Sequence, residues 1–170
     1  MRYLSILYMV TMGLLIHSPR AISSNNVRLG FEDTIPPPPV YKIDTLLKIS
    51  FGPCYGNCPV YDLTIFNDGT AIWNGIKNTS MTGPYVARLT RAQSMDLEKM
   101  AFSDALWSGP DFYPNPKSFI YDFPLHKLLI RNKEKSKYII INHSPSLDLK
   151  KLEERIYDLV DLLDWRSIAN

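Results

Sequence analysis

Apolar and polar residues alternate along several short segments of the chain from residue 43 onward. In residues 47–51 and 61–65 every second residue is apolar, which is the period of a half-buried strand. The second segment ends at Asn67-Asp68-Gly69, and another apolar segment, Thr70–Trp73, follows it. Asp-Gly between two such segments predicts a tight hairpin, because the turn needs residues with positive φ. Further strands are predicted around residues 85–89, 125–131 and 137–143.

Two other segments show the spacing of a helix. Thr90-Arg91-Ala92-Gln93 fits a capping box, and apolar residues follow it at helical spacing: Leu97, Met100, Ala101 and Ala105. The second segment begins with Ser144-Pro145 as cap and first turn. Its apolar face is formed by Leu149, Leu152, Ile156, Leu159 and Leu163.

The predicted order is three or four strands, a helix, two strands and a helix. Most connections are short enough for hairpins, so we predict an α+β domain with an antiparallel sheet of about five to six strands. Both helices are expected to pack on one face of that sheet. A doubly wound dinucleotide-binding fold is disfavoured, because strands do not alternate with helices and no Gly-x-Gly-x-x-Gly occurs.

The first 40 residues follow a different pattern. Arg2 precedes an apolar stretch from Tyr3 to Ile16, and a proline and the small-x-small residues Ala21-Ile22-Ser23 come next. This pattern is typical of a secretory signal peptide, here residues 1–23. The alternatives are a buried N-terminal helix and an uncleaved anchor, but the stretch is shorter than the roughly 20 residues that cross a bilayer.

Residues 24–40 are polar and then proline-rich, and Pro36–Pro39 favour a stiff polyproline segment. We interpret them as a tail or spacer before a single domain at residues 41–170. The leader carries no cysteine at its end, so a lipoprotein anchor is not supported. We therefore expect the protein in the periplasm or the medium, without a lipid anchor and without a transmembrane segment in the mature chain.

The charge of the mature chain is balanced. The 19 basic residues, less Arg2 and Arg20 of the leader, leave 17, and these match the 17 acidic residues. A neutral domain does not attract phosphate backbones over long range, so nucleic acid is not an expected partner.

Cys54-Tyr55-Gly56-Asn57-Cys58-Pro59 is the most informative segment. Two cysteines in an exported chain most simply form one disulfide. Pro59 pushes Cys58 toward the extended region, which starts the next strand. Closing a five-residue loop contributes roughly 2 kcal/mol in the chain-entropy model, so the bond would shape the turn more than hold the fold together.

Three functional roles for these cysteines compete with a structural disulfide. The pair could cycle between dithiol and disulfide, although a strand and not a helix follows it. Cys54, Cys58 and His143 resemble the ligand set of copper-delivery proteins, but those proteins have a thioredoxin fold. A nucleophilic cysteine is the third possibility, and a disulfide would abolish it.

The segment Pro53–Ile65, with Asp68-Gly69-Thr70 and Gly75 after it, resembles a family of exported bacterial domains of unknown function. Members of this family, common in Bacteroidota envelope proteins, carry a Cys-x-Gly-x-Cys-Pro-x-Tyr motif before an Asp-Gly hairpin. Asp122-Phe123-Pro124 and Trp165 match later marks of the family, whereas Tyr55 and Asn57 depart mildly from it. The resemblance covers roughly residues 43–166 and implies an exported α+β domain without an established activity.

Residues 110–124, which we call the aromatic segment, hold five aromatic rings among several prolines. Such rings can complete the core, or they can form a binding surface for a peptide or glycan. If residues 119–123 are extended, Phe119, Tyr121 and Phe123 share one side. We expect Phe119 and Phe123 to be structural, and Phe112 and Tyr113 to be an exposed candidate binding surface.

The remaining polar residues form no recognisable catalytic motif. His126 and His143 alternate with apolar residues and are expected to be hydrogen-bonded structural histidines. No Gly-x-Ser-x-Gly or His-Glu-x-x-His motif occurs, so we assign no catalytic residue, metal or cofactor. The sequence favours a non-enzymatic module that binds a protein, peptide or envelope component. The alternative is a thiol-redox or metal-handling protein that uses Cys54 and Cys58.

Overall fold

A computed structural model of the chain describes residues 42–169. The predicted signal peptide at residues 1–23 and the predicted spacer at 24–40 lie outside the described residues. Among residues 42–169, none of the helices combines the length and the apolar composition that a membrane-spanning helix needs.

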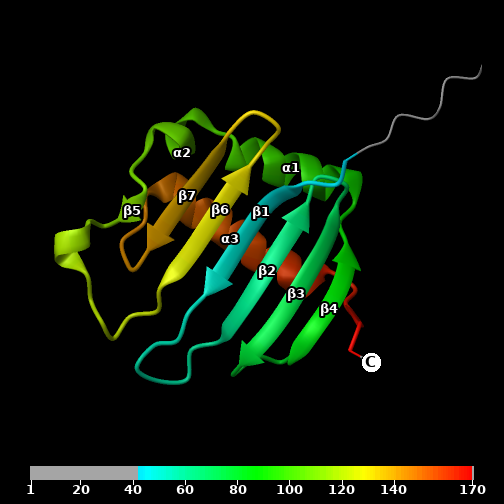
Figure 1. Ribbon diagram of the computed structural model, residues 1–170, viewed down its shortest axis with the longest axis horizontal. Coiled ribbons are helices and arrows are strands. Elements are labelled where there is room, and N and C mark those ends of the chain that lie inside the picture. The colour runs from blue at the N-terminus through cyan, green and yellow to red at the C-terminus, as the bar shows by residue number, and fades with distance from the viewer. Residues whose placement is uncertain (1–41, 170) are drawn as a thin grey trace, which may run out of the picture. The chain divides into compact units, whose positions relative to one another are not determined.

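The described strands form one sheet in the order β5-β7-β6-β1-β2-β3-β4-β8 (Figure 1). Neighbouring strands are antiparallel, except that β5 runs parallel to β7. The strands are β1 (Thr45–Phe51), β2 (Val60–Phe66), β3 (Thr70–Lys77), β4 (Gly83–Arg88), β5 (Phe112–Tyr113), β6 (His126–Arg131), β7 (Ser136–Ile141) and β8 (Arg166–Ser167).

The structure confirms an α+β fold but corrects the predicted sheet. It has eight strands instead of five to six, and the sheet is mixed. The two additional strands, β5 and β8, are two residues long and lie at the edges. A two-residue strand shows no alternation of apolar and polar residues, so the sequence pattern could not reveal either one.

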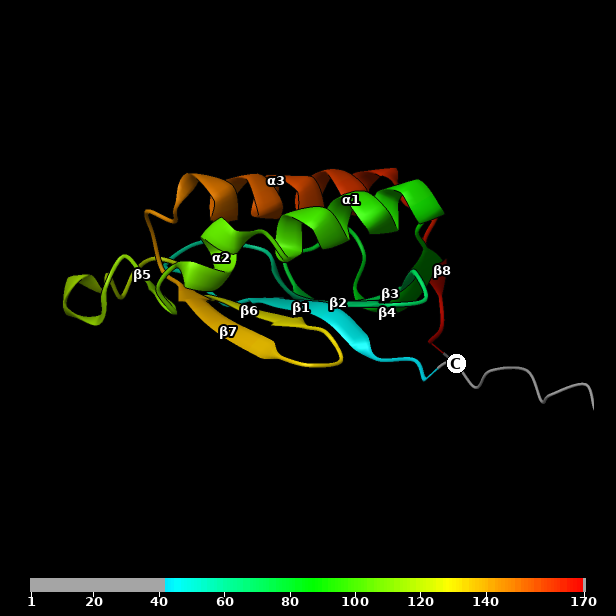
Figure 2. The same cartoon turned by 90° about the horizontal axis from the view of Figure 1, so that it is seen from above.

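Three helices lie on the same face of the sheet (Figure 2): α1 (Arg91–Ala101), α2 (Asp104–Ser108) and α3 (Leu147–Leu162). The predicted capping box of α1 is confirmed, since Thr90 Oγ1 accepts from Gln93 N at 3.3 Å and Gln93 Oε1 accepts from Thr90 N at 2.8 Å. Ser146 caps α3 by accepting from Leu149 N, so that helix starts slightly later than the Ser144-Pro145 prediction.

The predicted continuation of the first helix to Ala105 is wrong. The chain leaves the helix at Phe102 and starts α2 at Asp104. The indole N–H of Trp107, in α2, donates to the Ala101 carbonyl at 3.2 Å. A carbonyl at the end of α1 thereby gains a partner, which stabilises the break between the two helices.

The core fills the space between the sheet and the helices. Leu47, Ile49 and Leu63 point from the central strands toward Leu97 of α1 and Ile156 of α3, and all five are almost fully buried. Complete burial of each such side chain stabilises the fold by about 1.5–3 kcal/mol. This packing makes the sheet a rigid support for the loops at its ends.

A row of aromatic rings crosses the sheet at the end where β1 stops and β2 begins. Tyr61 stacks on Phe51 at 4.4 Å and on Trp73 at 4.1 Å between ring centroids. His126 packs on the other side of Phe51, and Trp165 packs against Trp73. The strand register pairs Phe51 with Tyr61 and with His126, so rings from neighbouring strands meet on one face.

Candidate functional site

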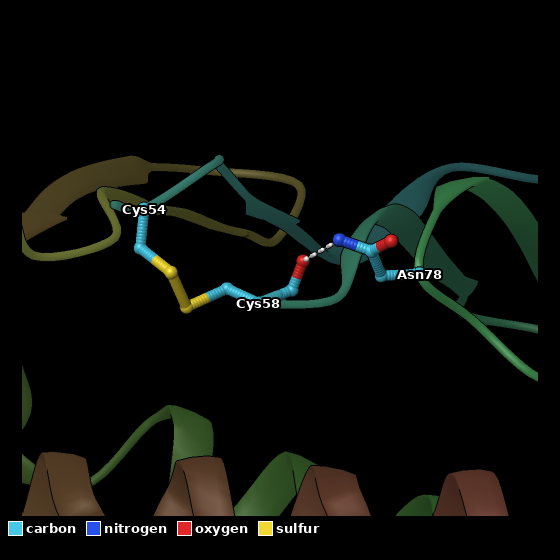
Figure 3. The surroundings of a disulfide bond; sticks show 3 residues. All are labelled: Cys54, Cys58 and Asn78. Atoms are coloured by element: carbon cyan, nitrogen blue, oxygen red, sulfur yellow. Dashed lines mark hydrogen bonds between the residues drawn. A yellow bond between two sulfur atoms is a disulfide. The ribbon is translucent and has the colours of Figure 1, made fainter. Parts of the chain in front are cut away.

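The Cys54–Cys58 turn joins β1 to β2. The two cysteines form a disulfide with their Cα atoms 5.7 Å apart. Asn78 Nδ2, in the loop between β3 and β4, donates to the Cys58 carbonyl at 3.2 Å (Figure 3). On the other side of the turn, Tyr55 N donates to the Asp122 carbonyl at 3.1 Å. The disulfide turn therefore connects two loops that are distant in the sequence.

The proposed ligand set of Cys54, Cys58 and His143 is not assembled. Among residues 42–169 no group of three or more His, Cys, Asp or Glu side chains is placed to hold a metal ion. His143 Nε2 instead lies 2.9 Å from the Ser118 carbonyl, and Nδ1 lies 3.0 Å from Ser144 Oγ. The contact between His143 and Ser118 therefore joins the aromatic segment to the residues that follow β7.

The prediction that Tyr113 is exposed is wrong. Tyr113 is 7% exposed and belongs to the core, and Phe112 is half-buried. Both lie in β5, whose parallel pairing with β7 brings Tyr113 beside Ile141. That pairing turns the tyrosine ring inward. Phe112 and Tyr113, the predicted binding surface, are therefore held mainly by packing against the rest of the protein.

The exposed rings of the segment lie further along the chain. Tyr121 is 90% exposed and Phe123 is 46% exposed. Phe123 is therefore not a core ring, which corrects the prediction. Phe119, by contrast, is half-buried and packs edge-on against Tyr121, with 5.0 Å between the ring centroids. Tyr55 of the disulfide turn is also 90% exposed.

Asn142 holds this exposed segment in place. It is buried at the end of β7, where its Oδ1 accepts from Ile120 N at 2.7 Å and its Nδ2 donates to the Ile120 carbonyl at 3.0 Å. Its own N–H donates to the Tyr113 carbonyl. One side chain thereby satisfies both backbone groups of Ile120, a role that the sequence pattern did not indicate.

We define Tyr55, Ile120, Tyr121 and Phe123 as the aromatic surface. Its two loops are joined by the Tyr55–Asp122 backbone hydrogen bond, and all four side chains are exposed. Tyr55 and Tyr121 are the most exposed of the large apolar side chains in the described residues, and exposed side chains on loops held in place by a scaffold are common contact points. Tyrosine is enriched in protein interfaces because its ring is large and its hydroxyl is polar.

A polar cluster lies between α3 and the sheet at the same end of the sheet, with Glu153 and Tyr157 in α3 and His126 in β6. His126 Nδ1 lies 2.8 Å from Glu153 Oε1, and Glu153 is buried. Partial burial, reinforced by the charge of Glu153, raises the pKa of Tyr157 to about 12. Burial also raises the pKa of Tyr61 well above its usual value. The expectation that His126 is hydrogen-bonded is confirmed, and Glu153 is the partner that the sequence did not reveal.

The protein is a two-layer α+β domain with a disulfide turn and an exposed aromatic surface at one end of its sheet. It belongs to the family described as Domain of unknown function (DUF6438), whose model matches residues 45–160. The matched region runs from β1 into α3 and includes the disulfide turn and the aromatic segment. A comparison with curated proteins finds no match.

Proposed function

We propose that this protein is a non-enzymatic binding module and that its aromatic surface contacts a protein or a peptide. The exposure of Tyr55 and Tyr121, each 90% exposed on two loops joined by a backbone hydrogen bond, carries this proposal. The disulfide and the Asn142 side chain restrict these loops before any partner arrives. Pre-organisation of this kind lowers the entropy that binding loses.

A selection from a displayed peptide library tests the proposal. The affinity of each enriched peptide is then measured by calorimetry for the wild-type protein and for the Tyr55→Ala/Tyr121→Ala variant. The variant should bind at least about tenfold more weakly, as when an aromatic hot spot is truncated. Tyr138→Ala is the matched control, because Tyr138 is exposed on β7 outside the aromatic surface. Absence of any enriched peptide, or equal loss in the control, would contradict the proposal.

We also infer that the protein is exported. The leader pattern in residues 1–23 and the disulfide-bonded pair both support this inference. Expressed with its leader, the protein should be recovered from the periplasm or medium with an N-terminus near Ser24. N-terminal sequencing that finds Met1 on a membrane-bound species would overturn it.

A further inference from the structure

The face of the sheet opposite the three helices is uncovered in the described part of the chain (Figure 2). Lys48 is exposed between the buried residues Leu47 and Ile49, so it points away from the core. Residues that pair across neighbouring strands lie on the same face, and the register therefore identifies the other side chains on this side. We call the side to which Lys48 points the open face.

Basic side chains gather on the open face. The strand register places the following residues there: Lys48, Arg88, Lys127, Arg131 and Arg166. Among the described strands Asp62 is the only acidic residue, and its carboxylate accepts a hydrogen bond from Ser50. The helices on the other side contain more acidic than basic residues. The fold therefore separates charges that are nearly balanced in the sequence.

Lys48, Lys127 and Arg131 carry the uncompensated charge of this face. Lys48 pairs with Leu129, so Lys127 and Arg131 are its diagonal neighbours on β6, at about 7–8 Å. None of the three makes an ion pair within residues 42–169. Like charges repel one another, so anionic groups that contact these three side chains are favoured.

The positive charge extends across most of the sheet. Arg88 and Arg166 line a hollow at the other side of the open face together with Asp164. Arg88 also donates to the Asp68 carbonyl at 3.2 Å, so nearby acidic residues partly compensate this end. Five strand spacings separate β6 from β8, which is roughly 24 Å. A partner that meets all of these basic side chains is therefore an extended anionic surface and not a single small anion.

Apolar side chains lie between the basic ones. Leu129 is half-buried, and its partner on β7, Tyr138, is 48% exposed. Ile140, the next residue on this side of β7, is half-buried. A lipid–water interface accepts this combination, because basic groups meet lipid phosphates, tyrosine lies at the level of the headgroups, and aliphatic groups reach the acyl boundary.

We propose that the open face docks on an anionic phospholipid surface. Lys48, Lys127 and Arg131 contact the lipid phosphates, and Leu129 and Tyr138 lie at the level of the headgroups. The acidic helical side then faces away from the lipid, so the separation of charge orients the protein. A soluble polyanion would meet the basic groups but would leave the apolar side chains in water. The proposal does not depend on the aromatic surface, and either proposal can fail alone.

Sedimentation of the purified protein with phosphatidylcholine vesicles tests the proposal. Vesicles that also contain about 30% phosphatidylglycerol should bind the protein at least about tenfold more tightly than vesicles without it. The difference should shrink when NaCl is raised from about 50 to about 500 mM, because salt screens exposed charges. Equal binding to both vesicles would overturn the proposal. Calorimetric binding to polygalacturonate without binding to anionic vesicles would also overturn it and would indicate an acidic glycan.

Charge reversal on the two sides of the protein locates the contact. Lys48→Glu/Lys127→Glu should weaken binding to the anionic vesicles at least about tenfold. Lys150→Glu/Lys151→Glu is the matched control, because both lysines are exposed on α3 and the net charge changes by the same amount. Lys48→Gln/Lys127→Gln repeats the test if the reversal lowers the melting temperature. Equal losses on the two sides would show that net charge and not the open face governs binding, and would refute the assignment.

Discussion

Tyr113 and Tyr121 lie in the same proline-rich segment, but one ring is in the core and the other is in solvent. Removal of a buried ring loses its transfer free energy and leaves a cavity. We therefore predict that Tyr113→Ala lowers the free energy of unfolding by about 3–5 kcal/mol. Tyr121→Ala should change it by less than about 0.5 kcal/mol, as exposed positions do. Urea denaturation of both variants checks this, and similar losses would contradict the placement of Tyr121.

Asn142 shows how one buried amide can position a loop. Its side chain accepts from and donates to the backbone of Ile120. Asn142→Ala leaves both groups without that partner, so we predict a loss of about 1–3 kcal/mol and faster hydrogen exchange at the Ile120 amide. Asn142→Asp keeps an acceptor for the Ile120 N–H and should retain part of that protection. Unchanged exchange in the alanine variant would show that Asn142 does not hold the segment.

The disulfide turn is hydrogen-bonded to the loops that contain Asn78 and Asp122. We predict that Cys54→Ser/Cys58→Ser lowers the free energy of unfolding by about 2 kcal/mol or less, because the closed loop is short. The fold should persist, since the core residues lie outside the turn. Denaturation curves and amide spectra measure the two effects, and a wholly unfolded double variant would contradict the prediction.

The reduction potential of the same bond separates a structural disulfide from a redox-active pair. A structural disulfide should have a potential below about −300 mV, whereas a potential above about −230 mV is typical of redox-active pairs. Equilibration in dithiothreitol and glutathione buffers measures it. The higher value would favour the thiol-redox alternative for Cys54 and Cys58.

Across the molecule, Tyr157 of α3 and Tyr61 of β2 predict sensitivity to alkaline pH. The pKa of Tyr157 is raised from 10.0 to about 12, mainly by partial burial, and the pKa of Tyr61, which is almost fully buried, is raised further. The folded protein therefore favours the neutral tyrosines. The contribution of Tyr157 to stability is complete below pH 10 and is lost as the pH rises from 10 toward 12.

Denaturation midpoints between pH 8 and pH 12 test this dependence. The free energy of unfolding should fall above pH 10 in the wild type and should fall less in Tyr157→Phe, which cannot ionise at that position. Tyr121→Phe is the control, because Tyr121 is exposed. A decline of the same steepness in Tyr157→Phe and wild type would exclude Tyr157 as a source of the alkaline sensitivity.

Features with a local physical cause could be predicted from the amino-acid sequence. The period of two in residues 47–51 and 61–65 indicated β1 and β2, and the Asp68-Gly69 turn indicated the hairpin that follows β2. Gly69 has φ of +84°, as that turn requires. The capping box at Thr90 and the Cys54–Cys58 disulfide could also be predicted from the sequence, because each depends on residues that are close in the chain.

Features that depend on contacts between distant residues could be seen only in the folded chain. Tyr113 is buried because β5 pairs with β7, and α1 is separated from α2 with Trp107 bonded back to Ala101. The aromatic surface exists because the backbone of Tyr55 meets that of Asp122. The burial of a ring is set by such neighbours, and local composition does not encode which neighbours they are.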